Sequence, residues 1–217
     1  MNDISQTQGN NGAEITWAER ANPKFVTDHI AAILEKPGPH RLAVPGGKTP
    51  LPIFDILSKR ALPWENISIL LTDDRIVADD HPDSNQGKLA AAFGATSAQI
   101  LSLKKKKNMR PEPFGLVWLG MGADGHIASL FPVMEAEHID GPAIIKTIPE
   151  PLPPEAPFER LSLNMAALVN SKEIMLVVRG CDKKQVLREA ITGKSHLPIA
   201  QLFTQARCPI TIFWSQS

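Results

Sequence analysis

Short apolar runs rich in β-branched residues alternate along this 217-residue chain with segments of helical periodicity. Nearly continuous apolarity suits strands that are buried on both faces, as in a parallel sheet. The predicted strands span residues 41–44, 66–71, 114–119, 173–178 and 208–213. Between them, apolar spacing predicts helices over 25–34, 50–57 and 182–191. This alternation predicts an α/β sheet with helices on both faces.

Cap residues indicate where two of these helices begin. Thr49 is expected as the N-cap of the 50–57 helix, with Pro50 at the first helical position. Asp182 is expected to open the 182–191 helix. In open α/β sheets, ligands bind beyond the carboxyl ends of the strands. Functional residues are therefore sought in the loops that follow the predicted strands.

The composition is that of an ordinary globular protein. Hydrophobic residues make up 43% and charged residues 21%, which excludes disordered, collagenous and coiled-coil chains. The length favours one domain over residues 1–217. The 23 Lys and Arg residues balance the 23 Asp and Glu residues, so the charge gives no indication of binding to nucleic acid or an anionic membrane.

Cysteine usage and the first residues bear on the compartment. Residues 1–15 are polar, lack the basic start and apolar stretch of a signal peptide, and are expected to form a flexible N-terminal segment. No run approaches the ~20 apolar residues that span a bilayer. Cys181 and Cys208 form no CxxC pair and no metal-ligand spacing, which favours a reduced compartment. We expect a cytoplasmic protein without a metal site.

Two segments between the periodic runs are expected to lie on the surface. Residues 148–157 hold five prolines and are predicted to form a rigid connection, after a short antiparallel excursion at 143–147. The lysine run 104–107 is predicted to be solvated rather than to bind an anion.

Three strings resemble phosphate loops, and none has the full context. The sequences at 47–49 and 193–195 read Gly-Lys-Thr and Gly-Lys-Ser, but Leu42 and Arg188 stand where a P-loop needs its first glycine. Residues 120–125 match GxGxxG after a strand, but Pro132 would stop the helix that a dinucleotide fold requires. A nicotinamide or flavin site is therefore disfavoured.

Two loops carry groups suited to an anion. Gly46 and Gly47 follow the first predicted strand, where backbone N–H groups can turn outward beside a helix N-terminus. An ordinary tight turn is the alternative. Asp-Asp-Arg at 73–75 closes the next strand, and 83–85 looks like a helix start. The guanidinium of Arg75 suits a phosphate or carboxylate, with a surface ion pair as the alternative.

A histidine on a glycine-rich loop is the candidate base. His126 follows the strand 114–119, and Asp124 lies two residues earlier. A neutral imidazole can take a proton from water, and a carboxylate can orient it. A surface histidine is the alternative, but the glycines and the strand-end position favour catalysis.

Two lysines follow the strand 173–178. Lys183 and Lys184 fall in the first turn of a helix, where the helix dipole disfavours positive charge. A bound anion would offset this repulsion. Solvation of both is the alternative, and spacing does not choose between the two.

Taken together, these loops resemble the 6-phosphogluconolactonase family. GMGADGHIASLFP is similar to its signature G-x-G-x-D-G-H-x-A-S-L-F-P, and TDDRIVADDHPDSN to its D-E-R-x-V-x…S-N segment. PGGKTP resembles its G-G-S-T-P turn and RGCDKK its G-x-x-K helix start. The match runs from about residue 25 to about residue 213, in the family's order.

The resemblance implies a Rossmann-like, doubly wound, mostly parallel α/β fold, shared with glucosamine-6-phosphate deaminases and ribose-5-phosphate isomerases. It implies hydrolysis of 6-phospho-D-glucono-1,5-lactone to 6-phospho-D-gluconate without cofactor or metal. His126 becomes the general base and Asp124 its neighbour. Arg75 and Lys183, the lysine in G-x-x-K register, become the phosphate ligands, and Gly46 and Gly47 backbone donors.

The full set of candidate substrate-binding residues is Gly46, Gly47, Lys48, Asp73, Arg75, Ser84, Asn85, Gly125, Arg160 and Lys183. Arg160 either reaches the phosphate or pairs on the surface. The chain departs from the family pattern at three places. Asp74 replaces a glutamate, Lys48 replaces a serine, and the chain ends in TIFWSQS without an acidic-alanine tail.

Other functions are weighed against the lactonase. A glucosamine-6-phosphate deaminase carries a glutamate shortly after the loop histidine, whereas in this chain the first glutamate after His126 is Glu135. A non-catalytic sugar-phosphate sensor would not need the Asp124–His126 pair, and a dinucleotide-binding oxidoreductase ranks last. A monomer and a small homo-oligomer both stay open. So do δ- against γ-lactone preference and the pentose phosphate against the Entner–Doudoroff route.

Overall fold

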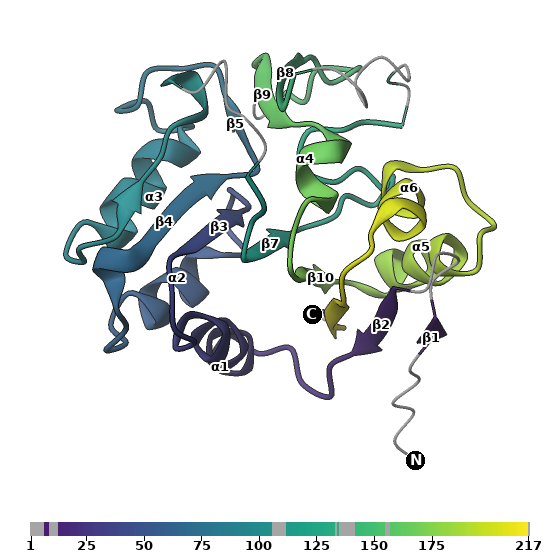
Figure 1. Ribbon diagram of the computed structural model, residues 1–217. Helices are drawn as coiled ribbons and strands as arrows, with labels where there is room; N and C mark the ends of the chain where they lie inside the picture. Colours follow the sequence, from purple (N-terminus) through teal and green to yellow (C-terminus); the bar gives the residue numbers. More distant parts are fainter. Residues whose placement is uncertain are drawn as a thin grey trace.

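A mostly parallel sheet forms the centre of the molecule (Figure 1). The computed structural model describes residues 7–8, 13–105, 112–132, 134, 142–154 and 157–216. In spatial order the strands are β1 (Thr7–Gln8), β2 (Glu14–Trp17), β11 (Ile210–Ser215), β10 (Ile174–Arg179), β7 (Leu116–Leu119), β3 (His40–Val44), β4 (Ile67–Leu71) and β6 (Gln99–Ile100). All pairs are parallel except β1 with β2, so the predicted sheet type is confirmed.

Helices cover both faces of this sheet, as the sequence predicts. One face carries α1 (Pro23–Leu34), α2 (Leu51–Leu57) and α3 (Asn85–Phe93), and the other α4 (Met165–Val169), α5 (Cys181–Ile191) and α6 (Pro198–Gln205). Short 3-10 turns, η1 (Trp64–Asn66) and η2 (Leu103–Lys105), complete the set. Phe54 of α2 packs edge-on against Phe93 at 5.4 Å and Trp118 at 5.5 Å, which fixes α2 and α3 on β7.

Two predicted helix starts differ from the structure. Helix α2 begins at Leu51 after Pro50, and no side chain caps it, so Thr49 is not the N-cap. Helix α5 begins at Cys181 after Gly180, whose φ of +106° allows the sharp turn out of β10. Asp182 therefore lies inside the first turn rather than opening the helix.

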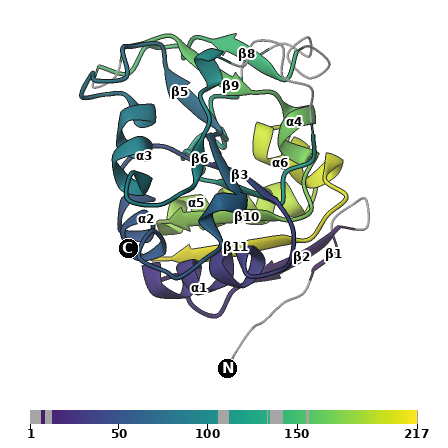
Figure 2. The same ribbon diagram turned by 60° about the vertical axis from the view of Figure 1, so that its left-hand side comes forward.

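A second, antiparallel sheet holds β5 (Asp73–Arg75), β9 (Arg160–Leu163) and β8 (Ile144–Thr147). The excursion predicted at 143–147 is confirmed, but residues 73–75 do not close a main-sheet strand. Thr72 marks the change of sheet, because its N–H donates to Val44 while its carbonyl accepts from Leu163. Both views place this sheet at the end opposite α1 and the N-terminal strands (Figure 2). The described part of the proline-rich segment, 148–154 and 157, holds neither helix nor strand, as predicted.

The N-terminal segment 1–15 and the lysine run 104–107 differ from the predictions. Ala13 and Ile15 are buried, so the chain belongs to the core from residue 13 on, and of residues 1–12 only β1 is described. Lys104 is anchored rather than solvated, because its Nζ donates to Asp79 Oδ1 at 2.6 Å and to the Val77 carbonyl at 2.5 Å. The other end of the run, 106–107, lies outside the described residues.

No described helix is long and apolar enough to cross a membrane.

Candidate active site

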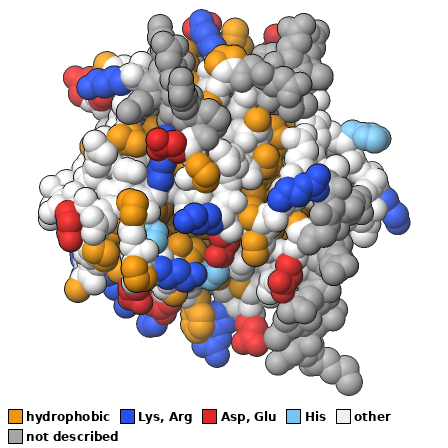
Figure 3. All heavy atoms as spheres, viewed as in Figure 1, with side chains coloured by type: hydrophobic (Ala, Val, Ile, Leu, Met, Phe, Trp, Pro, Cys, Tyr) orange, Lys and Arg blue, Asp and Glu red, His pale blue; other side chains and the backbone are white. Residues whose placement is uncertain are grey.

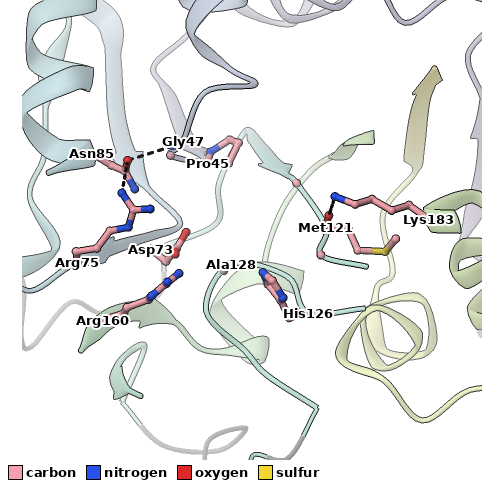
Figure 4. Close-up of a pocket in the computed structure, with 13 residues that line it drawn as sticks. Pro45, Gly47, Asp73, Arg75, Asn85, Met121, His126, Ala128, Arg160 and Lys183 are labelled. Atoms are coloured by element: carbon pink, nitrogen blue, oxygen red, sulfur yellow. Dashed lines mark hydrogen bonds between the residues drawn. The ribbon is translucent and has the colours of Figure 1, made fainter. Parts of the chain in front are cut away.

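A pocket of about 290 Å³ opens between the main sheet and the small sheet (Figure 4). The loops after β3 and β7 and the first turn of α5, which follows β10, form one part of its wall, and β5 and β9 another. This agrees with a site beyond the carboxyl ends of parallel strands. The lining residues are Pro45, Gly46, Gly47, Asp73, Arg75, Asn85, Gly120, Met121, Gly122, His126, Ala128, Arg160 and Lys183.

Eight of the predicted substrate and catalytic residues line this pocket, and four do not. Asp124 contacts His126 Nδ1 but is not part of the lining, and Lys48 is exposed outside it. Ser84 is buried and caps α3 by accepting from the Gly87 N–H at 3.1 Å, which is a structural task. Gly125 adopts a φ of +78° and packs against Leu197, so it shapes the loop rather than the pocket wall.

His126 is held by its neighbour Asp124. Its Nδ1 lies 2.7 Å from Asp124 Oδ1, and its backbone N–H donates to the same oxygen at 3.3 Å. A carboxylate accepts only, so Nδ1 carries the hydrogen and Nε2 of the neutral ring keeps its lone pair. The side chains of His126 and Asp124 are 32% and 52% exposed, which leaves the ring open to water and ligand.

Gly122 makes room for this pair. A Cβ at Gly122 would overlap the imidazole of His126 and the carboxylate of Asp124. The Gly122 N–H also donates to the His126 carbonyl at 3.0 Å, which closes the loop. The glycine-rich string therefore serves the histidine, and no helix follows it over the described residues 120–132, as the sequence predicts.

Arg75 and the glycine turn are joined through Asn85. The Asn85 Oδ1 accepts from the Gly47 N–H at 3.1 Å and from Arg75 Nη1 at 3.3 Å. Arg75 Nη1 also donates to the Asp83 carbonyl at 2.9 Å. A Cβ at Gly46 would overlap the Asn85 side chain, so the turn needs glycine at this position. Of the two predicted backbone donors, the Gly47 N–H is thus bonded to Asn85. The Gly46 N–H is the other candidate donor for a ligand.

Asp74 points away from the pocket, toward the start of α3. Its carboxylate accepts from the backbone N–H groups of Arg75 and Asn85, both at 2.9 Å, and of Gln86 at 3.2 Å. Burial raises the pKa of the Asp74 carboxyl above its usual value, although these hydrogen bonds oppose the rise. The shorter side chain that replaces the family glutamate thus contacts a helix N-terminus, a favourable place for a carboxylate.

Asp73, on the other face of β5, does line the pocket. Its Oδ2 accepts from Ser129 Oγ at 2.6 Å, and the Ser129 N–H donates to Ser162 Oγ at 3.1 Å. Asp73, Ser129 and Ser162 are all buried. This network connects the His126 loop to the small sheet.

The structure separates the two lysines. Lys183 lines the pocket, and its Nζ donates to the Met121 carbonyl at 2.7 Å. Lys184 lies over the Trp214 ring, 3.8 Å from its centroid, and does not line the pocket. In Figure 4, Arg75 and Arg160 lie to one side of His126 and Lys183 to the other.

Arg160 belongs to the site rather than only to the surface. It is the register partner of Arg75 on the neighbouring strand, so the two side chains leave the same face of the small sheet. Its guanidinium lies 5.8 Å from the ring centroid of Phe131. Three cationic side chains thus line one pocket, which suits an anionic ligand.

Sequence reasoning missed the backbone around the histidine. Met121 and Ala128 line the pocket, and Ala128 adopts a φ of +49°, a left-handed conformation that costs an L-residue about 1–2 kcal/mol. Periodicity carries no signal for such a position. Among the described residues, no group of three or more His, Cys, Asp or Glu side chains is placed to hold a metal ion.

A second hollow of about 420 Å³ adjoins the pocket and shares Arg75, His126 and Arg160 with it. Phe131 and prolines of the 149–153 segment line it as well, together with Asp124. On the face seen in Figure 3, Lys and Arg side chains are interspersed with Asp and Glu rather than joined into one basic surface.

The fold and the pocket define an α/β protein with a histidine–carboxylate pair and three cations beyond its parallel strands, an arrangement suited to a small anionic substrate. The chain belongs to the family described as glucosamine-6-phosphate isomerases/6-phosphogluconolactonase, whose sequence profile matches residues 17–214.

Individual relatives agree with this assignment. The chain is 33% identical to a protein named 6-phosphogluconolactonase from Neisseria meningitidis, over 78% of this chain and 82% of that protein. It is 30% identical to one of the same name from Mesorhizobium japonicum, over 94% and 97%. The fold is similar to the crystal structure of a 6-phosphogluconolactonase from Shewanella baltica, with a TM-score of 0.77, 28% identity, and coverage of 93% and 97%.

Proposed function

We propose that this chain hydrolyses 6-phospho-D-glucono-1,5-lactone to 6-phospho-D-gluconate. The observation that carries the proposal is the His126–Asp124 pair, open at the wall of a pocket that three cations line. The family assignment and the names of its relatives support the substrate.

His126 acts as the general base. Its Nε2 takes a proton from a water molecule while the water oxygen forms a bond to C1 of the lactone, a role that contributes about 10²–10⁴-fold. The bond between C1 and the ring oxygen then breaks, and the ring oxygen leaves as a hydroxyl with the proton from His126. Asp124 holds the ring at Nδ1 and stabilises the imidazolium between the two steps.

The cations bind the phosphate and so position the lactone. Arg75 and Lys183 are the phosphate ligands, and Arg160 faces the same space from β9. A hydrogen bond to a charged group contributes about 1.5–3 kcal/mol. Holding the far end of the substrate keeps C1 close to His126, which lowers the entropy cost of the reaction.

Backbone donors stabilise the oxyanion that forms at C1. The Gly46 N–H, in the turn after β3, is the candidate donor, since the Gly47 N–H is bonded to Asn85. One such donor is worth roughly 3–4 kcal/mol in favourable sites.

The test is acid release from 6-phospho-D-glucono-1,5-lactone at neutral pH, corrected for the spontaneous rate. His126→Ala is expected to lower kcat by about 10²–10⁴-fold while the melting temperature stays near the wild-type value. His40→Gln is the matched control, because His40 stands at the amino end of β3, whereas the pocket lies beyond the carboxyl end of that strand. If His126→Ala turned over the lactone as fast as the wild type, His126 would not be the general base.

The same assays separate the alternatives. Ammonia release from glucosamine 6-phosphate would identify a deaminase. Tight 6-phospho-D-gluconate binding with no hydrolysis by the wild type would identify a sensor.

A further inference from the structure

Trp214, near the end of β11, contacts the chain on both sides of Lys183. Its indole Nε1 donates to the Gly180 carbonyl at 2.7 Å. Its ring lies under the ammonium of Lys184, 3.8 Å from the centroid. Lys183 stands between these two contact points, in the first turn of α5.

Gly180 decides the direction in which α5 leaves the sheet. Its φ of +106° forms the turn between β10 and α5, and no side chain caps the helix. Its N–H donates to the Ser215 carbonyl at 3.0 Å, and its carbonyl accepts from Trp214. Both polar groups of this residue are therefore fixed by the last residues of β11.

Lys184 is held away from the pocket by the same ring. Its Nζ also lies 5.8 Å from the Trp17 centroid, so two indoles face one ammonium. Contact with aromatic rings stabilises a cation that the helix dipole disfavours in a first turn. With Lys184 bound there, Lys183 is the lysine of the pair that lines the pocket.

We propose that Trp214 is a positioning residue that sets where the Lys183 ammonium lies at the pocket, and so determines affinity for the phosphate of the substrate. Lys183 lines the pocket, and its Nζ donates one hydrogen to the Met121 carbonyl at 2.7 Å. An ammonium has three donors, so two are left for a ligand. If the first turn of α5 tilted, the Lys183 ammonium would move away from the Met121 carbonyl and from the phosphate of the substrate. The proposal rests on the function proposed above, in which Lys183 binds phosphate.

The test uses a variant that keeps the ring and removes one hydrogen bond. Trp214→Phe retains a face for Lys184 but cannot donate to Gly180. It is expected to raise the KM for 6-phospho-D-glucono-1,5-lactone about fivefold to tenfold while kcat changes less than twofold. KM and kcat for D-glucono-1,5-lactone, which carries no phosphate, should stay unchanged.

Trp64→Phe is the matched control. Trp64 Nε1 donates to the Arg60 carbonyl at 3.0 Å, so the control loses the same kind of bond, at a residue that does not line the pocket. Its KM should equal that of the wild type.

A double-mutant cycle shows whether Trp214 acts through Lys183. In a Lys183→Met background, Trp214→Phe should produce no further rise in KM. Equal KM values for Trp214→Phe and the wild type, or effects that add in the double variant, would overturn the proposal.

Calorimetric binding of 6-phospho-D-gluconate to the same variants tests the positioning independently of turnover. There the dissociation constant should rise fivefold to tenfold in Trp214→Phe and stay unchanged in Trp64→Phe. A wild type that binds this compound without hydrolysing the lactone contradicts the proposed function, whereas an active wild type with an unaffected Trp214→Phe contradicts only the role of Trp214.

Discussion

His126 owes its orientation to two residues of its own loop. Asp124 bonds Nδ1 at 2.7 Å, and Gly122 leaves the space in which the ring and the carboxylate lie. The Phe131 ring packs beside the imidazole, with centroids 5.2 Å apart. The His126 side chain, 32% exposed, is thus fixed by local contacts rather than by burial, and its ring stays open to water and ligand.

Gly122→Ala is expected to reduce both activity and stability. The added methyl group overlaps the His126 and Asp124 side chains, so the pair must move, at a cost of about 1–3 kcal/mol. We expect kcat to fall at least about tenfold, since catalysis needs the base within hydrogen-bond distance of the water it activates. The measurement is kcat together with urea unfolding.

Gly115→Ala provides the comparison for this variant. A Cβ there meets its nearest atom, the Arg41 carbonyl oxygen, at 3.6 Å, an ordinary contact. Unchanged kcat in Gly115→Ala and in Gly122→Ala alike would mean that the loop adapts and that Gly122 does not set the histidine.

At the scale of the element, the start of α3 depends on Asp74. Three backbone N–H groups donate to its buried carboxylate, and two of them belong to the first turn of α3. Asp74→Ala leaves these donors without their acceptor, and the free energy of unfolding should fall by about 1–3 kcal/mol. Asp80→Ala, in the exposed loop before α3, should change it by less than about 0.5 kcal/mol.

The pH dependence of this variant has a definite sign. Because burial raises the pKa of Asp74 in the folded state, the folded protein binds this proton at a higher pH than the unfolded chain. The stability margin of the wild type over Asp74→Ala should therefore widen as the pH falls from neutral through that pKa. A margin that narrows on acidification would indicate that the backbone hydrogen bonds outweigh burial and lower the pKa.

Local pattern predicts elements well where the surroundings are uniform. Continuous apolar runs coincide with the strands β3, β4, β7, β10 and β11. A strand that is buried on both faces needs apolar side chains along its whole length, whichever strands lie beside it. The sequence predicts that residues 73–75 close the preceding strand, since nothing in it marks the change of sheet at Thr72. That change depends on Leu163, far along the chain.

The site divides in the same way. His126 and Asp124 are two residues apart, so their pairing follows from local sequence. The choice between Lys183 and Lys184 does not, because it depends on Trp214 at the end of the chain. Asn85, which joins the glycine turn to Arg75, likewise acts between segments whose proximity only the fold provides.

At the scale of the whole molecule, the pocket exists because two sheets meet. The main sheet supplies His126 from the loop after β7 and Lys183 from the first turn of α5, which follows β10, and the small sheet supplies Arg75 and Arg160. The distance from His126 to Arg75 and Arg160 therefore depends on how the two sheets are joined. The buried bond from Ser129 Oγ to Asp73 Oδ2, at 2.6 Å, joins the histidine loop to β5.

Ser129→Ala tests this connection. The change leaves a buried carboxylate oxygen without its donor and should lower the free energy of unfolding by about 1–3 kcal/mol. If the bond also sets the spacing of the site, the kcat/KM for the phosphorylated lactone should fall several-fold. Ile30→Val, a core change in α1 that costs about 0.5–1.5 kcal/mol, should lower stability and leave kcat/KM unchanged. Equal kcat/KM in both variants would show that the bond stabilises the fold without positioning the catalytic base.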